Sequence, residues 1–166
     1  MSKEIVINNL LRNKRILFAT FAFLGGILSG IVVNVFPFIM NNSFLSWVIP
    51  GALDAALIGA MTVYAQNYYQ TKCFKINDGL KGAFKKGLMV GAIGGFAAYV
   101  VVQLLGAGNM SRSIGWAISG GVAGFVVSNQ VPNLKMKTAI IAGAIGGFVG
   151  CIFMLMDFGY TLGVGI

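Results

Sequence analysis

Five long apolar stretches, separated by short polar segments, constrain this chain more than any other feature of its sequence. A helix needs about 20 apolar residues to cross the hydrocarbon core of a bilayer, and each stretch is close to that length. The apolar runs are continuous rather than alternating, which disfavours a barrel of strands. We therefore expect an all-α integral membrane protein with five transmembrane helices, at about residues 16–36, 45–66, 87–106, 113–131 and 138–157.

The composition supports the bilayer as the main solvent. Apolar residues make up 57% of the 166 residues, charged residues make up 10%, and the mean hydropathy is +0.84. A water-facing surface needs far more charge than this. The length fits a single polytopic membrane domain over residues 16–166, preceded by a basic cytoplasmic or interfacial segment at 1–15. The apolar spacing within that segment suggests a short helix lying along the membrane surface.

Membrane topology explains the formal net charge of +8 better than nucleic-acid binding does. Basic residues lie in the 1–15 segment, in the 67–86 connection and in the 132–137 turn, whereas the intervening connections are almost uncharged. A cytoplasmic N-terminus places all twelve Lys and Arg residues except Arg112 on the cytoplasmic side, as the positive-inside rule requires. Five crossings then put the C-terminus outside. We expect a protein of the bacterial cytoplasmic membrane with no nucleic-acid partner and with no cleaved signal peptide.

The 67–86 connection also carries aromatic residues among its lysines. Lysine next to aromatic side chains can bind anionic lipid head groups, although topology alone also places lysines on this side. The candidate head-group ligands are Lys72, Lys75, Lys81, Lys85 and Lys86.

The segment GAIGGF occurs twice, at 91–96 and at 143–148, each time a few residues after a lysine. The two copies belong to a longer correspondence between residues 85–101 and 136–153. The expected first span resembles a lone copy of the same element. We interpret the match as an internal repeat whose copies enter the membrane from the same side.

The spans that precede the two GAIGGF segments correspond more loosely. Trp47 is followed four positions later by Gly51, and Trp116 is followed four positions later by Gly120. Spans two and three are therefore expected to be duplicated as spans four and five, which makes the chain a duplicated helical hairpin.

Glycines recur at a spacing of four residues in four of the five expected spans. Residues four apart share a helix face, and glycine lets two helices in lipid approach closely enough for dispersion and weak Cα–H···O contacts. Two interpretations stay open: the stripes pack the helices of one chain, or a free stripe joins another copy or a partner subunit. We favour assembly, because so many stripes exceed what five helices use internally. The candidate packing glycines are Gly26, Gly30, Gly87, Gly91, Gly95, Gly120, Gly124, Gly143, Gly146, Gly147 and Gly150.

The stretch SRSIGWAISGGVAGF, followed by a basic turn and AIIAGAIGGFVG, resembles the glycine-rich, glycine-zipper type helical hairpins of assorted bacterial membrane proteins. In some of those proteins the hairpin lies next to signalling domains such as forkhead-associated domains. The resemblance covers mainly 111–153, with a fainter echo over 43–101, and consists of glycine spacing and a Gly-Trp pair. It implies a hairpin fold element and brings no catalytic residues.

Asp54 is the main candidate for chemistry, because it lies near the middle of the second expected span. An ionised carboxylate is costly in a bilayer core, so Asp54 should face protein or water. A proton or cation site there would also use Pro50, whose kink frees a nearby backbone carbonyl. The alternative is a protonated Asp54 that hydrogen-bonds a neighbouring helix, with Asn34 or Gln103 as partner. The repeat does not decide between them, since the position equivalent to Asp54 is Ala123.

Four residues mark the expected outer boundary of the membrane. Arg112 and Asp157 are candidates for an interfacial ion pair that anchors helix ends. Trp47 and Trp116 lie where an aromatic belt is expected. We interpret all four as interface anchors.

Enzyme signatures are missing from the sequence. The chain contains no histidine, and no phosphate-binding loop ends in Gly-Lys-Ser/Thr. Cys73 lies in a basic connection and Cys151 in an apolar run, which supports neither a disulfide framework nor a metal site. We expect no enzyme activity, no metal and no cofactor.

Three function classes remain. The favoured one is a non-enzymatic membrane protein whose glycine-striped helices build a homo-oligomer or hold a partner subunit. The alternative is a channel or transporter for ions, protons or a small solute that uses Asp54. A third class, the substrate-capturing membrane subunit of a vitamin importer, has similar length but no obvious internal duplication, which counts against it.

Overall fold

The computed structural model describes residues 13–35, 44–73, 76, 78–106, 108–131 and 133–155. These residues form five helices and no strand, which confirms the expected all-α class. The helices are α2 (Lys14–Val35), α4 (Leu45–Thr71), α5 (Asp78–Leu105), α6 (Asn109–Gln130) and α7 (Met136–Leu155).

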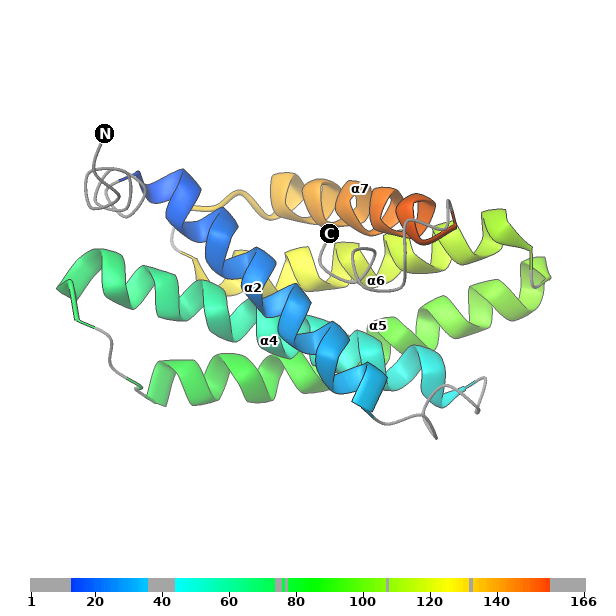
Figure 1. Ribbon diagram of the computed structural model, residues 1–166, viewed down its shortest axis with the longest axis horizontal. Coiled ribbons are helices and arrows are strands. Elements are labelled where there is room, and N and C mark those ends of the chain that lie inside the picture. The colour runs from blue at the N-terminus through cyan, green and yellow to red at the C-terminus, as the bar shows by residue number, and fades with distance from the viewer. Residues whose placement is uncertain are drawn as a thin grey trace.

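The helices run back and forth, so that their ends gather at the two ends of an elongated bundle (Figure 1). The first residues of α2, α5 and α7 and the last residues of α4 and α6 lie toward the same end, on the left in Figure 1. Nearly all described basic residues lie in or near these helix ends, and we call this the basic end. Its members are Lys14, Arg15, Lys72, Lys81, Lys85, Lys86, Lys135 and Lys137.

The connection expected at 67–86 is mostly helical. Helix α4 continues to Thr71, and α5 begins at Asp78 instead of at residue 87. Lysine is a good helix former, so the lysines that end the apolar run do not end the helix. Lys72 ends α4 in the left-handed conformation, with φ of 55°, and its N–H donates to the Tyr68 carbonyl at 2.8 Å.

Three helices are long and apolar enough to cross a membrane: α2 over Lys14–Val32, α4 and α5. The apolar part of α7, Met136–Ile152, is shorter, and α6 does not reach the same hydropathy. Several serines, together with Arg112 and the sequence Ser-Asn-Gln at its C-terminal end, lower the hydropathy of α6. The structure thus supports a membrane protein with three candidate spanning helices, whereas the five predicted crossings stay a proposal.

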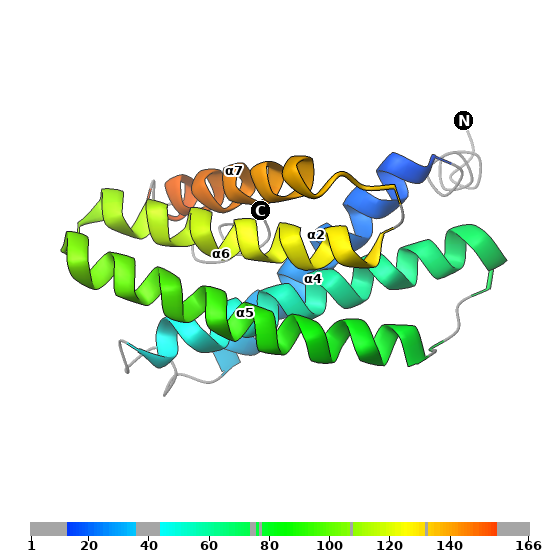
Figure 2. The ribbon, with the colours of Figure 1, turned by 180° about the vertical axis from the view of Figure 1, so that it is seen from behind.

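Helix α4 is central to the packing. It contacts α2, α5 and α6, while α5 also contacts α6, and α6 contacts α7. The chain therefore contains two antiparallel hairpins, α4–α5 and α6–α7, with α2 crossing α4 (Figures 1 and 2).

Small residues fill the contacts between helices, and large apolar side chains point outward. The side chains of Ile93, Leu104 and Ile141 are 69%, 79% and 59% exposed. Such an exterior is unfavourable in water but normal in lipid, where apolar side chains lose nothing by facing the hydrocarbon. The most deeply buried alanines, each 1% exposed or less, are Ala55, Ala56, Ala65, Ala83 and Ala98.

Candidate functional site: the glycine contacts and the Asp54–Ser29 pair

Helices α4 and α5 meet backbone to backbone through glycines. A Cβ atom added to Gly51 would lie 2.9 Å from both the Gly91 carbonyl oxygen and the Gly95 Cα. A Cβ atom added to Gly87 would lie 2.7 Å from the Ala56 backbone nitrogen. Real Cβ atoms essentially never come within 3.0 Å of another heavy atom, so these positions require glycine at this helix separation.

Helices α6 and α7 meet in the same manner. A Cβ atom on Gly120 would lie 3.0 Å from the Gly143 carbonyl carbon, and one on Gly143 would lie 2.9 Å from the Gly120 carbonyl carbon. A Cβ atom on Gly124 would lie 2.7 Å from the Ala139 carbonyl carbon. The second hairpin is therefore also closed by backbone contact.

The two hairpins share one register. Each residue of α4 corresponds to the residue 69 positions later in α6, so Gly51 corresponds to Gly120. Each residue of α5 corresponds to the residue 52 positions later in α7, so Gly91 corresponds to Gly143. The Gly51–Gly91 contact of the first hairpin thus recurs as the Gly120–Gly143 contact of the second.

The same register holds where each hairpin reaches the end opposite the basic end. The rings of Phe44 and Tyr99 contact each other with centroids 5.4 Å apart. The equivalent positions, 44 + 69 and 99 + 52, are Ser113 and Cys151, and the Ser113 hydroxyl donates to the Cys151 Sγ at 3.6 Å. Gly150, beside Cys151, is buried as well.

The two adjacent glycines in each GAIGGF segment face different neighbours. In α5, Gly95 faces α4, whereas a Cβ atom on Gly94 would lie 2.7 Å from both methyl groups of Val122 in α6. In α7, Gly147 faces α6, but a Cβ atom on Gly146 would meet no described atom within 4 Å. Gly146 is the equivalent of Gly94, so the second hairpin leaves open the position that α6 fills in the first.

On α2 a glycine in close contact with α4 is Gly25. A Cβ atom on Gly25 would lie 2.9 Å from the Ile58 Cα. Gly26 is half-buried and Gly30 is buried. Gly25 is the first glycine of the doublet in α2. Spacing by four residues missed it.

The two tryptophans meet where the hairpins adjoin. The ring centroids of Trp47 and Trp116 are 6.5 Å apart, with 59° between the ring planes. A Cβ atom on Gly115 would lie 2.7 Å from the Trp47 ring. Both tryptophans are half-buried between α4 and α6, and their role as interface anchors stays a prediction. Arg112 is exposed in the first turn of α6, while Asp157, its predicted partner, lies outside the described residues.

Asp54 lies at the contact between α2 and α4. Helices α2 and α4 are antiparallel and contact each other at Gly25 and Ile58. Ser29 lies one turn after Gly25 on α2 and Asp54 lies one turn before Ile58 on α4, so the two side chains are neighbours. Ser29 is completely buried, and its Oγ has no hydrogen bond. The hydroxyl is adjacent to the Asp54 carboxyl and interacts with it, at a geometry outside that of a standard hydrogen bond.

The other predicted partners of Asp54 do not join this pair. Gln103 lies eight residues beyond Gly95, which itself contacts Trp47 near the start of α4. Gln103 is therefore beyond that end of α4, roughly 12 Å further along the helix axis, and it is exposed. The side chain of Asn34 lies outside the described residues.

Pro50 does not supply a ligand beside Asp54 either. The carbonyl that a proline leaves without its helical donor is four residues earlier, at Ser46. Ser46 precedes Asp54 by eight residues, or roughly 12 Å along α4, so the two oxygens cannot bind one ion.

Lysines and aromatic rings meet at the basic end. The Tyr69 ring centroid lies 5.8 Å from the Lys14 Nζ and 4.9 Å from the Lys72 Nζ, which links the first turn of α2 to the end of α4. Lys81 pairs with Asp78 at 3.6 Å on the surface. Among the predicted head-group ligands Lys72, Lys81, Lys85 and Lys86 are exposed, and Lys75 lies outside the described residues.

The described part of the chain contains no group of three His, Cys, Asp or Glu side chains that could hold a metal ion. Cys73 is exposed and Cys151 is buried, and both are free thiols. Comparison with protein families, with curated proteins and with solved structures finds no match. The geometry of the helix contacts is therefore the basis for a functional proposal.

Proposed function

We propose that this chain is a non-enzymatic polytopic membrane protein whose glycine-lined helices bind another copy of the chain or a partner subunit within the bilayer. All five helices cross the membrane in this proposal, and the basic end is cytoplasmic, in keeping with the positive-inside rule. Length and hydropathy support the crossing of α2, α4 and α5.

The shared register supports the crossing of α6 and α7. The equivalent contacts lie in the middle of each hairpin and at the end opposite the basic end, so the two hairpins match over that part. Helices α6 and α7, with 22 and 20 residues, are shorter than α4 and α5, with 27 and 28, but each is still about as long as a bilayer crossing needs. We infer that α6–α7 is a duplicate of α4–α5, inserted in the same orientation.

The observation that carries the proposal is the difference between Gly94 and Gly146. Gly94 receives Val122 of α6, so α5 is enclosed between α4 and α6. The equivalent Gly146 has no described neighbour. Glycine within a helix costs roughly 0.5–1 kcal/mol relative to alanine. A glycine at this open position therefore suits a further helix that approaches α7 as closely as α6 approaches α5.

Native mass measurement of the protein extracted in mild detergent tests this proposal. We expect wild-type protein in a complex larger than the single 17.5 kDa chain, and Gly146→Leu as a single chain. Gly82→Leu is the matched control, because Gly82 also has nothing within 4 Å but lies near the basic end. The proposal is wrong if wild-type protein is a lone chain, or if the two variants have the same mass.

A second candidate function is a path for protons or cations at Asp54. The observation that favours it is the completely buried Ser29 hydroxyl beside the Asp54 carboxyl, which places two polar side chains together between α2 and α4. Asp54→Asn should abolish proton- or cation-driven flux in proteoliposomes and leave the native mass unchanged. Asp78→Asn, which removes an exposed carboxylate at the basic end, should retain flux. Equal flux in wild-type and Asp54→Asn vesicles rejects this function.

A further inference from the structure

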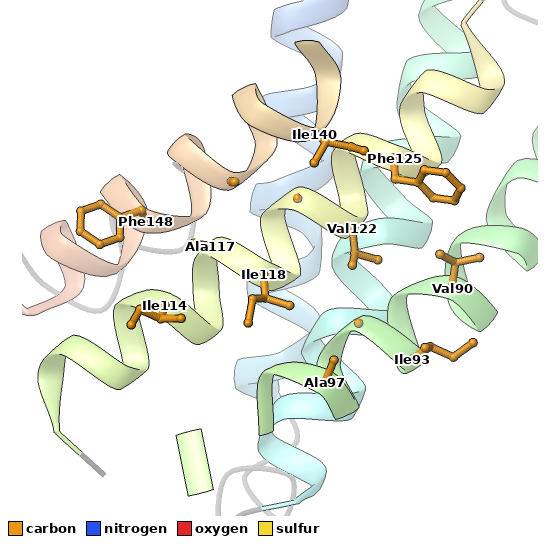
Figure 3. Close-up of a pocket in the computed structure, with 13 residues that line it drawn as sticks. Val90, Ile93, Ala97, Ile114, Ala117, Ile118, Val122, Phe125, Ile140 and Phe148 are labelled. Carbon is orange, nitrogen blue, oxygen red and sulfur yellow. The ribbon is translucent and has the colours of Figure 1, made fainter. Parts of the chain in front are cut away.

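A groove lined entirely by apolar residues runs along α6 between α5 and α7 (Figure 3). Its volume is about 600 Å³. On α6 the lining extends from Ile114 to Phe125, which at 1.5 Å per residue is roughly 16 Å. That length is close to half of the roughly 30 Å hydrocarbon thickness of a bilayer, the depth that the acyl chains of one leaflet fill.

Each helix that lines the groove carries a polar side chain about one turn beyond its last lining residue, on the side toward the basic end. These side chains are Lys86 on α5, Asn129 on α6 and Lys137 on α7, and all three are exposed. Residues three or four apart share a helix face, so each points along the groove face of its own helix. Among the described residues, neither lysine has a carboxylate partner.

The helix register places these three side chains at one height. Helix α5 meets α6 at Gly94, and α7 meets α6 at Ala139. Lys86 lies eight residues before Gly94 and Lys137 lies two residues before Ala139. Because both helices are antiparallel to α6, Lys86 and Lys137 lie at heights within about four residues of each other along α6, or roughly 6 Å, and Asn129 lies between these heights. Toward the basic end, the groove therefore ends at a level where each of its three helices carries a polar side chain.

We propose that this groove binds an acyl chain of an anionic phospholipid whose phosphate is held by Lys86, Asn129 and Lys137. In a bilayer an acyl chain gains little binding free energy by moving from lipid to an apolar groove. The groove therefore fixes the position of the lipid, and the two lysines select a negatively charged head group. A protein helix in the groove would leave both ammonium groups without a negative partner. A phosphate group supplies that partner between them.

This inference does not rest on the assembly proposal. The groove side of α7 is formed by Ile140, Ala144 and Phe148. Gly146 follows Ala144 by two residues, or about 200° around the helix, so it points to nearly the opposite side of α7. Loss of one interaction therefore leaves the other measurable.

Native mass spectrometry of the purified protein in neutral detergent, with added phosphatidylglycerol or phosphatidylcholine, tests the proposal. We expect one retained phosphatidylglycerol per chain and weaker retention of phosphatidylcholine. Each lysine near the surface of an anionic membrane contributes about a fivefold gain in binding, so Lys86→Gln/Lys137→Gln should bind phosphatidylglycerol about 25-fold more weakly. Lys14→Gln/Arg15→Gln removes the same charge from α2, which does not line the groove, and should bind like wild type.

A second pair of variants tests the groove itself. Ala97→Phe fills the groove from α5, whereas Met89→Phe places the same ring on an exposed position outside it. We expect Ala97→Phe to lose both lipids and Met89→Phe to retain them. Equal effects of the Lys86/Lys137 and Lys14/Arg15 double variants, or normal lipid binding by Ala97→Phe, overturn the proposal. Displacement of the lipid by inorganic phosphate alone also overturns the proposal, because the acyl chain would then have no role in binding. A fall in native mass with Ala97→Phe overturns it as well, because it indicates that a second copy of the chain occupies the groove.

Discussion

Substitution of Gly91 by alanine tests the backbone contact between α4 and α5. The added methyl carbon would lie 2.7 Å from the Ala55 Cβ and 2.9 Å from the Ala52 Cα, and it would overlap the Gly51 carbonyl oxygen. Ordinary contact begins near 3.4 Å, so the helices must separate locally by about 0.5–1 Å. A gap of about that size forfeits a quarter to a half of each dispersion contact, and overpacking of this kind costs about 1–3 kcal/mol.

Gly82→Ala is the control for this substitution. Nothing lies within 4 Å of a Cβ atom at Gly82, and the change in helix propensity is the same at both positions and cancels. We expect the free energy of unfolding of Gly91→Ala to be about 1–3 kcal/mol below that of Gly82→Ala. Gly143→Ala should cost a similar amount, because Gly143 makes the equivalent contact in the second hairpin.

The assay is reversible unfolding in mixed micelles, with increasing fractions of a denaturing detergent and circular dichroism as the readout. Equal unfolding free energies for Gly91→Ala and Gly82→Ala would refute the packing argument. A large cost at Gly91 with none at Gly143 would instead show that the two hairpins are not equivalent.

Three further predictions concern single contacts. In α6, Gly124→Ala should lower the free energy of unfolding by about 1–3 kcal/mol, whereas Gly121→Ala should be neutral or stabilising, because its methyl group would have its nearest neighbours at 3.7 Å. Thermal unfolding in detergent compares the stabilities of the two variants, and a less stable Gly121→Ala contradicts the prediction. Trp47→Leu should cost about 0.5–1.5 kcal/mol through loss of its ring pair and should shift the emission of the remaining Trp116; an unchanged emission spectrum argues against the contact. Tyr69→Leu should cost about 0.5–1 kcal/mol through loss of its contacts with Lys14 and Lys72, whereas Tyr69→Phe should not; equal stability of the two variants contradicts a cation–π contribution.

The apolar runs were enough to predict the approximate place of the five described helices but not where each one ends. Helix α5 begins at Asp78, nine residues before the membrane span expected from residue 87. Hydropathy reports which residues suit lipid, whereas a helix continues as long as its backbone bonds and propensities allow. Lys81, Lys85 and Lys86 end the apolar run without ending the helix.

The glycine spacing predicted shared faces but not the neighbour that each face meets. A spacing of four puts Gly91 and Gly95 on one side of α5, and the structure has both against α4. The same rule did not single out Gly25, which lies against Ile58 of α4, because the direction of a face depends on where the next helix lies. Nor does the sequence pair Asp54 with Ser29, since that juxtaposition arises only once α2 crosses α4.

Paired cysteines provide the most direct test of the shared hairpin register. Two cysteines form a disulfide only when their Cα atoms are within about 7 Å, so crosslinking reports the contact itself. The first pair is Phe44→Cys with Tyr99→Cys, in a chain whose two native cysteines are changed to serine. The second pair is Ser113→Cys with the native Cys151, in a Cys73→Ser chain.

Both pairs are to be oxidised mildly in native membranes and scored by gel migration without reducing agent. We predict that each pair forms a disulfide within one chain at a similar rate, because positions 113 and 151 of the second hairpin correspond to positions 44 and 99 of the first. Crosslinking of the first pair alone, or disulfides only between chains, would contradict the common register.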